Sequence, residues 1–83
     1  MKRTEVYVII DGERDYQDQK WAQEEHLHSP EEWLVYMQDY ITEAFHIAAR
    51  DTSSDYAVKM MNNIRKITAL GVCAIEQNGC TPR

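Results

Sequence analysis

The chain has 83 residues and a net charge of −5 at pH 7, and its hydrophobic and charged fractions are 43% and 28%. This length and composition indicate one globular domain over residues 1–83, with loose ends at 1–3 and 80–83, and argue against disorder. Because phosphate backbones attract a basic surface, the acidic balance argues against general nucleic-acid binding. It leaves room for a local cationic pocket.

The two cysteines, Cys73 and Cys80, are too few and too close together to form a disulfide scaffold. We therefore expect reduced thiols in a cytosolic protein. No stretch is apolar enough and long enough to span a bilayer, and the short apolar run near the start lacks a small-residue cleavage site. These features predict a cytoplasmic protein without a membrane partner.

The first predicted element is a helix over residues 4–21, followed by a polar loop or frayed extension. In this helix Val6, Ile9 and Ile10 share one side with Glu13, Gln17 and Trp21. Segment 5–10 also has strand propensity. However, every later apolar run has helical period, so no partner strand is available, and a lone strand cannot form its backbone hydrogen bonds. A strand there remains an alternative if the protein pairs edge to edge in an oligomer.

The second predicted helix covers residues 29–50 and has the clearest start signal. Ser29 and Glu32 have the spacing of a capping box, and Pro30 occupies the first helical position. Glu32, Asp39 and Glu43 lie on one face. The opposite, broad apolar face comprises Trp33, Leu34, Met37, Tyr40, Ile41, Ala44, Phe45, Ile47 and Ala48.

The third predicted helix covers residues 54–77, with Ser53 or Ser54 as its N-cap and Asn78-Gly79 as its stop. Its apolar face comprises Tyr56, Met60, Met61, Ile64, Ile67, Leu70, Gly71, Val72, Ala74 and Ile75. The short connection before it predicts an antiparallel αα-hairpin of the second and third helices, with the first helix packed across them. Apolar faces this wide predict a dimer or a larger assembly.

The acidic face of the second helix is a candidate metal site. Asp39 and Glu43 are one turn apart, close enough to share Mg²⁺, the ion that usually serves phosphoanhydride chemistry. A hard-cation site needs further ligands, and the third helix offers Asn62 and Asn63 but no carboxylate between Asp55 and Glu76. The spacing alone therefore favours a solvated acidic face.

A second candidate site lies on the first helix, where Glu13, Gln17, Lys20 and Trp21 continue an apolar side with polar groups. Polar residues on an otherwise apolar helix face occur most often at functional sites. Lys20 would contact a phosphate, Gln17 a base or ribose, and Trp21 would stack on a ring. The alternative is that the helix emerges from the core here and that Trp21 covers its end.

The third candidate site comprises Asn62, Asn63, Arg65 and Lys66 on the third helix. It is either a phosphate clamp or a salt-bridged surface, in which Lys59 and Lys66 would pair with acids of the second helix.

A pair of histidines, His26 and His28, is a fourth feature. Two alternate histidines can bind zinc, but such a site needs further ligands, and neither cysteine is placed to be an obvious partner. The interpretation we favour is therefore a loop in which burial or contact tunes the histidines, and a metal site is the alternative.

Together these residues resemble a known pattern: Glu13-Arg14-x-x-Gln17-x-x-Lys20-Trp21, then an acidic helix, then Ile64-Arg65-Lys66-Ile67-x-Ala69-Leu70 before Glu76-Gln77-Asn78-Gly79. The pattern resembles small phage and prophage proteins that look like distant relatives of the MazG-like all-α nucleotide pyrophosphohydrolases. The resemblance implies a helical fold, nucleotide binding and residence in an infected bacterial cell.

The family binds Mg²⁺ through E-E-x-x-E on one helix and E-x-x-D on the next. Here the first part reads Asp39-Tyr40-x-x-Glu43, and the stretch matching the second is Asn63-Ile64-Arg65-Lys66, with an amide and a base in place of the two acids. The departures from the family pattern therefore argue against hydrolysis.

The leading hypothesis is a non-catalytic, oligomeric phage-type protein that captures nucleotide messengers of bacterial defence and needs no cofactor. Lys20, Arg65 and Lys66 are its candidates for binding phosphates, and Trp21, Trp33 or Tyr16 for stacking on bases. One alternative is an Mg²⁺-dependent pyrophosphohydrolase that borrows acids from another subunit. A second alternative is an inhibitor that binds another protein through its acidic face.

Overall fold

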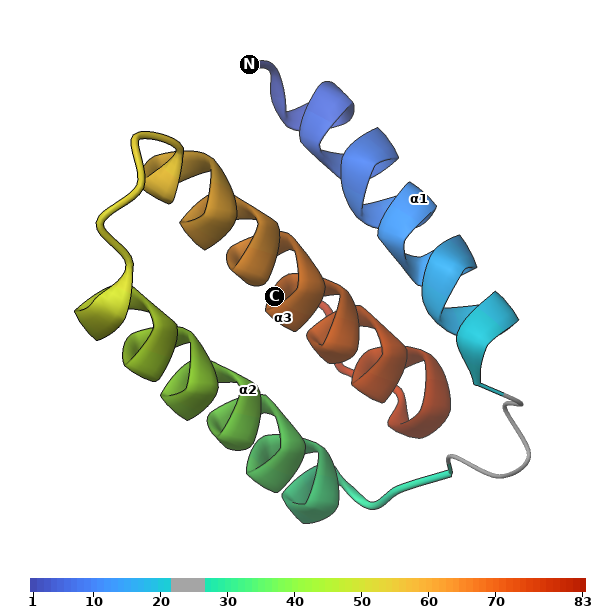
Figure 1. The fold of residues 1–83 in the computed structure, drawn as a ribbon. Coiled ribbons are helices and arrows are strands. Elements are labelled where there is room, and N and C mark those ends of the chain that lie inside the picture. Colours follow the sequence, from blue (N-terminus) through green and yellow to red (C-terminus); the bar gives the residue numbers. More distant parts are fainter. Residues whose placement is uncertain (22–26) are drawn as a thin grey trace.

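The computed structural model describes residues 1–21 and 27–83, which form three helices (Figure 1). They are α1 (Arg3–Lys20), α2 (Pro30–Arg50) and α3 (Tyr56–Asn78). The all-α class is confirmed, and the described residues contain no strand, so the strand alternative for segment 5–10 is wrong. Within the described part of the chain, none of the helices has the length and apolar character needed to cross a membrane.

The start of α2 matches its sequence signal. The Ser29 hydroxyl accepts a hydrogen bond from the Glu32 amide at 3.2 Å, and the Glu32 carboxylate accepts one from the Ser29 amide at 3.0 Å. Both bonds of the predicted capping box are therefore present, and they satisfy two amides that the helix leaves unpaired.

The start of α3 differs from the prediction by two residues, because neither serine caps it. The amide and hydroxyl of Ser53 both donate to Asp51 Oδ1, at 2.8 and 2.5 Å, and this local turn postpones the helix to Tyr56. Asp55 occupies the N-cap position without a side-chain capping bond. At the other end α3 stops at Gly79 as predicted. This glycine has a positive φ of 77° but a ψ of 169°, so it does not adopt the αL conformation of the usual helix stop.

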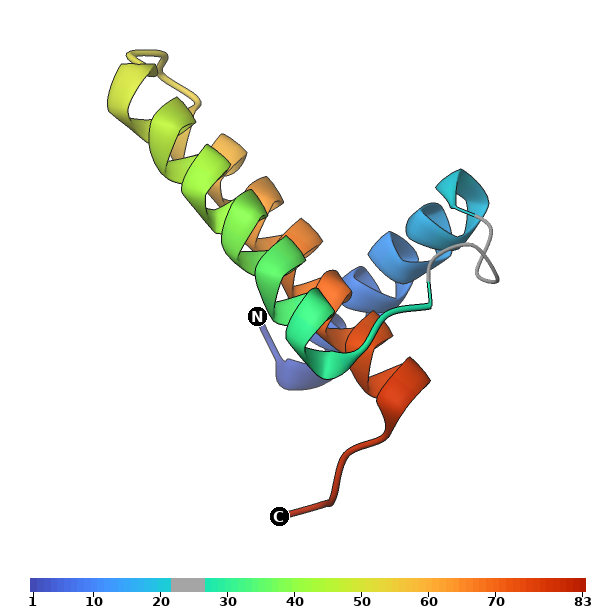
Figure 2. The same cartoon turned by 90° about the horizontal axis from the view of Figure 1, so that it is seen from below.

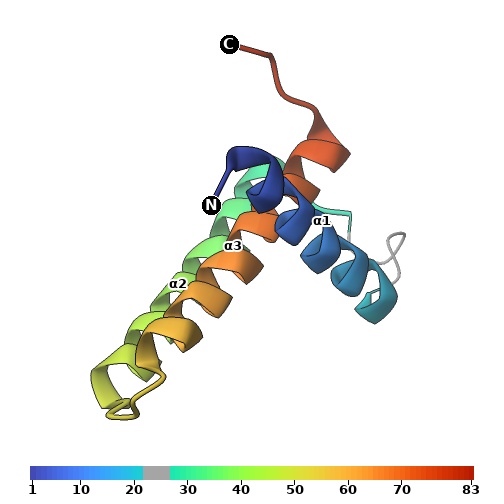
Figure 3. The ribbon, with the colours of Figure 1, turned by 90° about the horizontal axis from the view of Figure 1, so that it is seen from above.

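The helix α3 is the centre of the arrangement. It packs against both α1 and α2, whereas α1 and α2 share few contacts. The views of Figures 2 and 3 show α1 extending from one side of the α2–α3 pair. The radius of gyration is 14.0 Å, against about 12 Å expected for a compact domain of this length. The protomer is therefore an open arrangement rather than a closed bundle.

The core is small for a chain of this length. Its buried cluster consists of Trp33, Leu70 and Cys73, and the buried Ala69 lies beside it on α3. Partly buried residues packed against the cluster are Trp21, Met37, Tyr40 and Ala74. Burial raises the pKa of the Cys73 thiol, and neither this cysteine nor Cys80 forms a disulfide.

The predicted apolar faces of α2 and α3 are only partly covered. Trp33 and Leu70 are buried as expected, but Leu34, Phe45 and Ile64 are 66%, 70% and 51% exposed. One protomer therefore leaves much of both faces without a partner.

The helix α1 packs differently from the prediction. Its apolar residues Val6 and Ile9 are about two-fifths exposed, at 39% and 41%, whereas Glu13, Arg14 and Gln17 are buried. The alternative that the helix emerges from the core at its polar continuation is therefore wrong. The physical reason is that each of the three buried polar groups has a hydrogen-bond partner on α3, which offsets the cost of removing it from water.

Candidate functional site

Four of the predicted site residues meet where α1 packs on α3. Glu13 Oε1 accepts a hydrogen bond from Arg65 Nε at 2.6 Å, and Gln17 Nε2 donates to the backbone oxygen of Lys66 at 3.3 Å. The Glu13 side chain is 7% exposed and that of Arg65 is 41% exposed. Two groups that the sequence suggested separately therefore form one site.

Two small side chains of α3 are also buried. Ala69 and Cys73 are 0% and 4% exposed and are one helical turn apart. Glu13 and Gln17 are likewise one turn apart on α1, so both reach α3 from the same face. The polar contacts of the site are therefore positioned by regular helix rather than by loops.

A second ionic cluster lies beside the first. Arg14 donates to Glu76 at 2.5 Å, to Asp18 at 2.9 Å and to Gln17 at 3.3 Å. Burial alone would lower the pKa of Arg14, but the hydrogen bonds with Glu76 and Asp18 outweigh it and raise this pKa. Sequence analysis did not identify Arg14 as a site residue. The only local signal was its spacing of four from Asp18.

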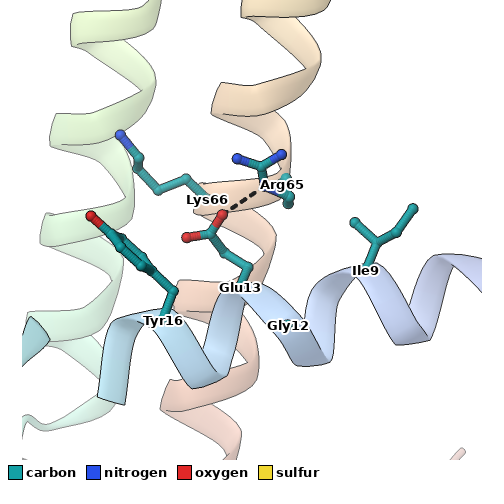
Figure 4. Close-up of a pocket in the computed structure, with 6 residues that line it drawn as sticks. All are labelled: Ile9, Gly12, Glu13, Tyr16, Arg65 and Lys66. Carbon is teal, nitrogen blue, oxygen red and sulfur yellow. Dashed lines mark hydrogen bonds and ion pairs between the residues drawn. The ribbon is translucent and has the colours of Figure 1, made fainter. Parts of the chain in front are cut away.

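An open hollow of about 530 Å³ adjoins the Glu13–Arg65 ion pair, and Figure 4 shows side chains from α1 and α3 around it. Its lining residues are Ile9, Gly12, Glu13, Tyr16, Arg65 and Lys66. Tyr16 supplies an aromatic ring that is 56% exposed. The hollow thus combines one ring, two cations and one carboxylate.

The Arg65 guanidinium at this hollow is held from two sides. Its Nε donates to Glu13, and its Nη1 donates to Asn62 Oδ1 at 3.0 Å. Within residues 1–21 and 27–83, Nη2 has no hydrogen-bond partner. The Lys66 ammonium lies 5.8 Å from the centre of the Tyr40 ring and forms no ion pair with a described residue. Two cationic groups are therefore available to an anion.

Two predicted site residues of α1 lie away from this hollow. Lys20 Nζ is 5.9 Å from the centre of the Trp21 ring. Trp21 itself follows the end of α1, packs against the core cluster and lines a second pocket of about 190 Å³. That pocket is also lined by His28, Trp33, Tyr36, Tyr40 and Leu70. The predicted group Glu13, Gln17, Lys20 and Trp21 is therefore divided between two places.

The candidate amides of α3 also separate. Asn62 supports Arg65, whereas Asn63 lines an apolar groove between α2 and α3 together with Ile41 and Ile67. Trp33, a candidate for stacking on a base, is 3% exposed and donates its Nε1 to Gln77 at 2.9 Å. Among the candidate stacking rings, Tyr16 is the one that lines the hollow with Arg65.

The acids Asp39 and Glu43 are both exposed on α2. In the described ranges 1–21 and 27–83, no group of three His, Cys, Asp or Glu side chains could hold a metal ion. Asp39 and Glu43 therefore have no third ligand in this part of the chain. Lys59, which we expected to pair with acids of α2, instead contacts Asp51 at 3.1 Å and Asp55 at 3.6 Å.

Of the two histidines, His26 lies outside the described residues. The His28 ring packs against Trp33 and Tyr36, with centroid distances of 5.2 and 4.8 Å, and its Nδ1 is 3.6 Å from Glu32. This half-buried position shows contact with neighbouring rings, in line with the interpretation that we favoured.

Comparisons of the chain with protein-family models, curated proteins and solved structures return no match. The resemblance to MazG-like proteins therefore remains a prediction from the residues alone.

Proposed function

We propose that the chain binds a phosphorylated nucleotide, linear or cyclic, in the hollow between α1 and α3 and does not hydrolyse it. The observation that supports this most directly is the fixed Arg65 guanidinium, held by Glu13 at 2.6 Å and by Asn62 at 3.0 Å. A guanidinium fork matches the geometry of a phosphate, and fixing it in advance lowers the entropy lost on binding.

The roles of the lining residues follow from their chemistry. Arg65 and Lys66 would contact phosphate oxygens, and Tyr16 would stack on the base. Glu13 stays paired with Arg65, so the two cations and one carboxylate leave one positive charge. In a chain with a net charge of −5, this local reversal of sign favours an anionic ligand at the hollow.

We propose that the nucleotide is not hydrolysed because too few carboxylates are available to bind Mg²⁺. Asp39 and Glu43 are two exposed acids on one helix, and α3 presents Asn63 and Lys66 where the related pattern has acids. Mg²⁺ in phosphoryl chemistry is held by carboxylates together with substrate phosphates, and two acids without a partner set make a weak site.

The biological setting of the proposal comes from the resemblance. In a phage-infected cell, binding without turnover would remove a nucleotide messenger from bacterial defence. We also retain the expectation that α2 and α3 form an antiparallel hairpin, and that the chain forms a homo-oligomer.

A thermal-shift screen against linear and cyclic nucleotides tests the proposal, because a ligand that binds the folded state raises the melting temperature. Arg65→Ala and Lys66→Ala should each reduce the shift. The matched control is Lys20→Ala, which removes a cation of α1 outside the hollow and should keep it.

Unchanged nucleotide recovered after heating the complex would support capture. Release of pyrophosphate in Mg²⁺, abolished by Asp39→Asn, would establish the enzyme instead. No shift with any nucleotide would reject the proposed site and favour a protein partner.

A further inference from the structure

One stripe of residues along α2 contains no charged side chain over most of the length of the helix. Its residues are Leu34, Gln38, Ile41, Phe45 and Ala48. The spacing alternates between four and three, which is the pattern of a seam between packed helices. Leu34 and Phe45 are 66% and 70% exposed, so this seam is largely unused within the protomer.

A matching stripe runs along α3. Its residues are Ala57, Met61, Ile64, Thr68, Gly71 and Ile75, again at alternating spacings of four and three. Met61, Ile64 and Ile75 are 60%, 51% and 54% exposed. Although 28% of the chain is charged, neither stripe contains a charged residue.

The two stripes form one surface, which we call the outer face. Phe45 and Ile64 line the same apolar groove of about 280 Å³ at one end. Leu34, Gly71 and Ile75 line a second hollow of about 310 Å³ at the other end.

The outer face lies away from α1. The α3 residues that bond to α1, namely Arg65, Lys66 and Glu76, lie outside the α3 stripe, on another side of the helix. In Figures 2 and 3, α1 likewise extends from one side of the α2–α3 pair only.

The size of the outer face suits a stable dimer. Helices of 21 and 23 residues are about 30–35 Å long, and two side by side are about 20 Å wide. The face then offers about 650 Å² per protomer, or about 1,300 Å² in a pair, within the range of specific interfaces.

The absence of charge favours a second copy as the occupant. Near a two-fold axis each residue lies close to its own copy, so any charge there would meet a like charge. The chain has a net charge of −5, yet this face carries none. The small core of Trp33, Leu70 and Cys73 also leaves a single protomer with little buried apolar area.

We propose that two copies pair through their outer faces, so that α2 and α3 of each form a four-helix bundle. Ile64 lies near the middle of the α3 stripe, and Phe45 lies toward one end of the contact. The hollow at Arg65 and Lys66 is on the side of α1 and stays accessible in the dimer. The dimer is independent of nucleotide binding, and either proposal can fail without the other.

Analytical ultracentrifugation of the full chain over a wide concentration range tests the dimer. The wild type should sediment as a dimer, and Phe45→Glu and Ile64→Lys should each shift it to monomer. The matched control is Val8→Glu on α1, where the apolar residue is 72% exposed but off the outer face, and it should remain dimeric.

A mixing experiment separates dissociation from misfolding. Ile64→Lys and Ile64→Glu should each fail to dimerise alone, because like charges meet, and an equimolar mixture should form the dimer again. Circular dichroism on the same samples shows whether helix is lost and regained with the dimer. A monomeric wild type, a dimer that Phe45→Glu and Ile64→Lys leave intact, or a mixture that stays monomeric would each overturn the proposal.

Discussion

The guanidinium of Arg14 donates to the carboxylate of Glu76 at 2.5 Å and thereby joins the middle of α1 to the last turns of α3. The Arg14 side chain is 5% exposed and that of Glu76 is 49% exposed. A buried cation is tolerated only when it is paired and hydrogen-bonded. This pair therefore holds α1 in place, and through α1 it positions the hollow at Arg65.

Removal of the carboxylate by Glu76→Ala should lower the free energy of unfolding by about 1–2 kcal/mol. The loss stays in this range because Glu76 is half exposed and solvent screens the pair, and because Arg14 keeps Asp18 as a partner. Urea unfolding followed by circular dichroism, at one fixed protein concentration, measures the change. The control is Asp39→Ala, an exposed acid of α2, with an expected change below about 0.5 kcal/mol. Equal losses in the two variants would contradict the role assigned to Glu76.

Gly12→Ala should stabilise the protein. Gly12 lies within α1, and an added Cβ would meet nothing within 4 Å. Alanine is favoured over glycine inside a helix by about 1 kcal/mol, so we expect a gain of about 0.5–1 kcal/mol. Thermal melts read by circular dichroism give the result. The contrasting variant is Gly79→Ala, which should destabilise because Gly79 has φ 77°. A lower melting temperature for Gly12→Ala would show that the side chains around it leave no room.

Asp51 should contribute to the loss of folding stability at acid pH. Hydrogen bonds from the side chain and backbone of Ser53, and an ion pair with Lys59, lower the pKa of Asp51 from 3.8 to about 2. The folded-state pKa is therefore the lower one, so the stabilisation is complete above 3.8 and is lost as the pH falls toward about 2. Asp51→Asn should make the stability profile shallower in this window, and Ser53→Ala should do so in part. An unchanged acid slope in Asp51→Asn, from urea melts at several pH values, would refute this.

Local features of the fold were predictable from the sequence, because their partners are near in the chain. The capping box joins Ser29 to Glu32, three residues on, and the α3 stop depends on Gly79 alone. The start of α3 was misplaced for a local reason too. As an N-cap, Ser53 would accept a hydrogen bond from an amide of the first helical turn. Instead its amide and hydroxyl donate to Asp51, and the helix begins only at Tyr56.

The burial of α1 could not be predicted in the same way. Glu13 and Arg14 find their partners 52 and 62 residues along the chain, so a helical wheel of α1 alone places the apolar end inside. The wheel did single out Glu13 and Gln17 as polar groups on an otherwise apolar face. Glu13 and Gln17 meet Arg65 and Lys66 because of the way α1 packs on α3, and the periodicity of one helix carries no information about that packing.

Arg65→Lys conserves the charge but should weaken nucleotide binding about tenfold. A lysine ammonium cannot donate to both Glu13 and Asn62 and at the same time offer a phosphate the paired N–H groups of a guanidinium. Isothermal titration with the nucleotide that gives the largest thermal shift measures the affinity. The matched control is Lys66→Arg, which conserves charge at a cation that has no ion pair with a described residue and should change affinity little. Equal affinity for Arg65→Lys and wild type would mean that the hollow attracts anions by charge alone, and the role assigned to the fixed guanidinium would be wrong.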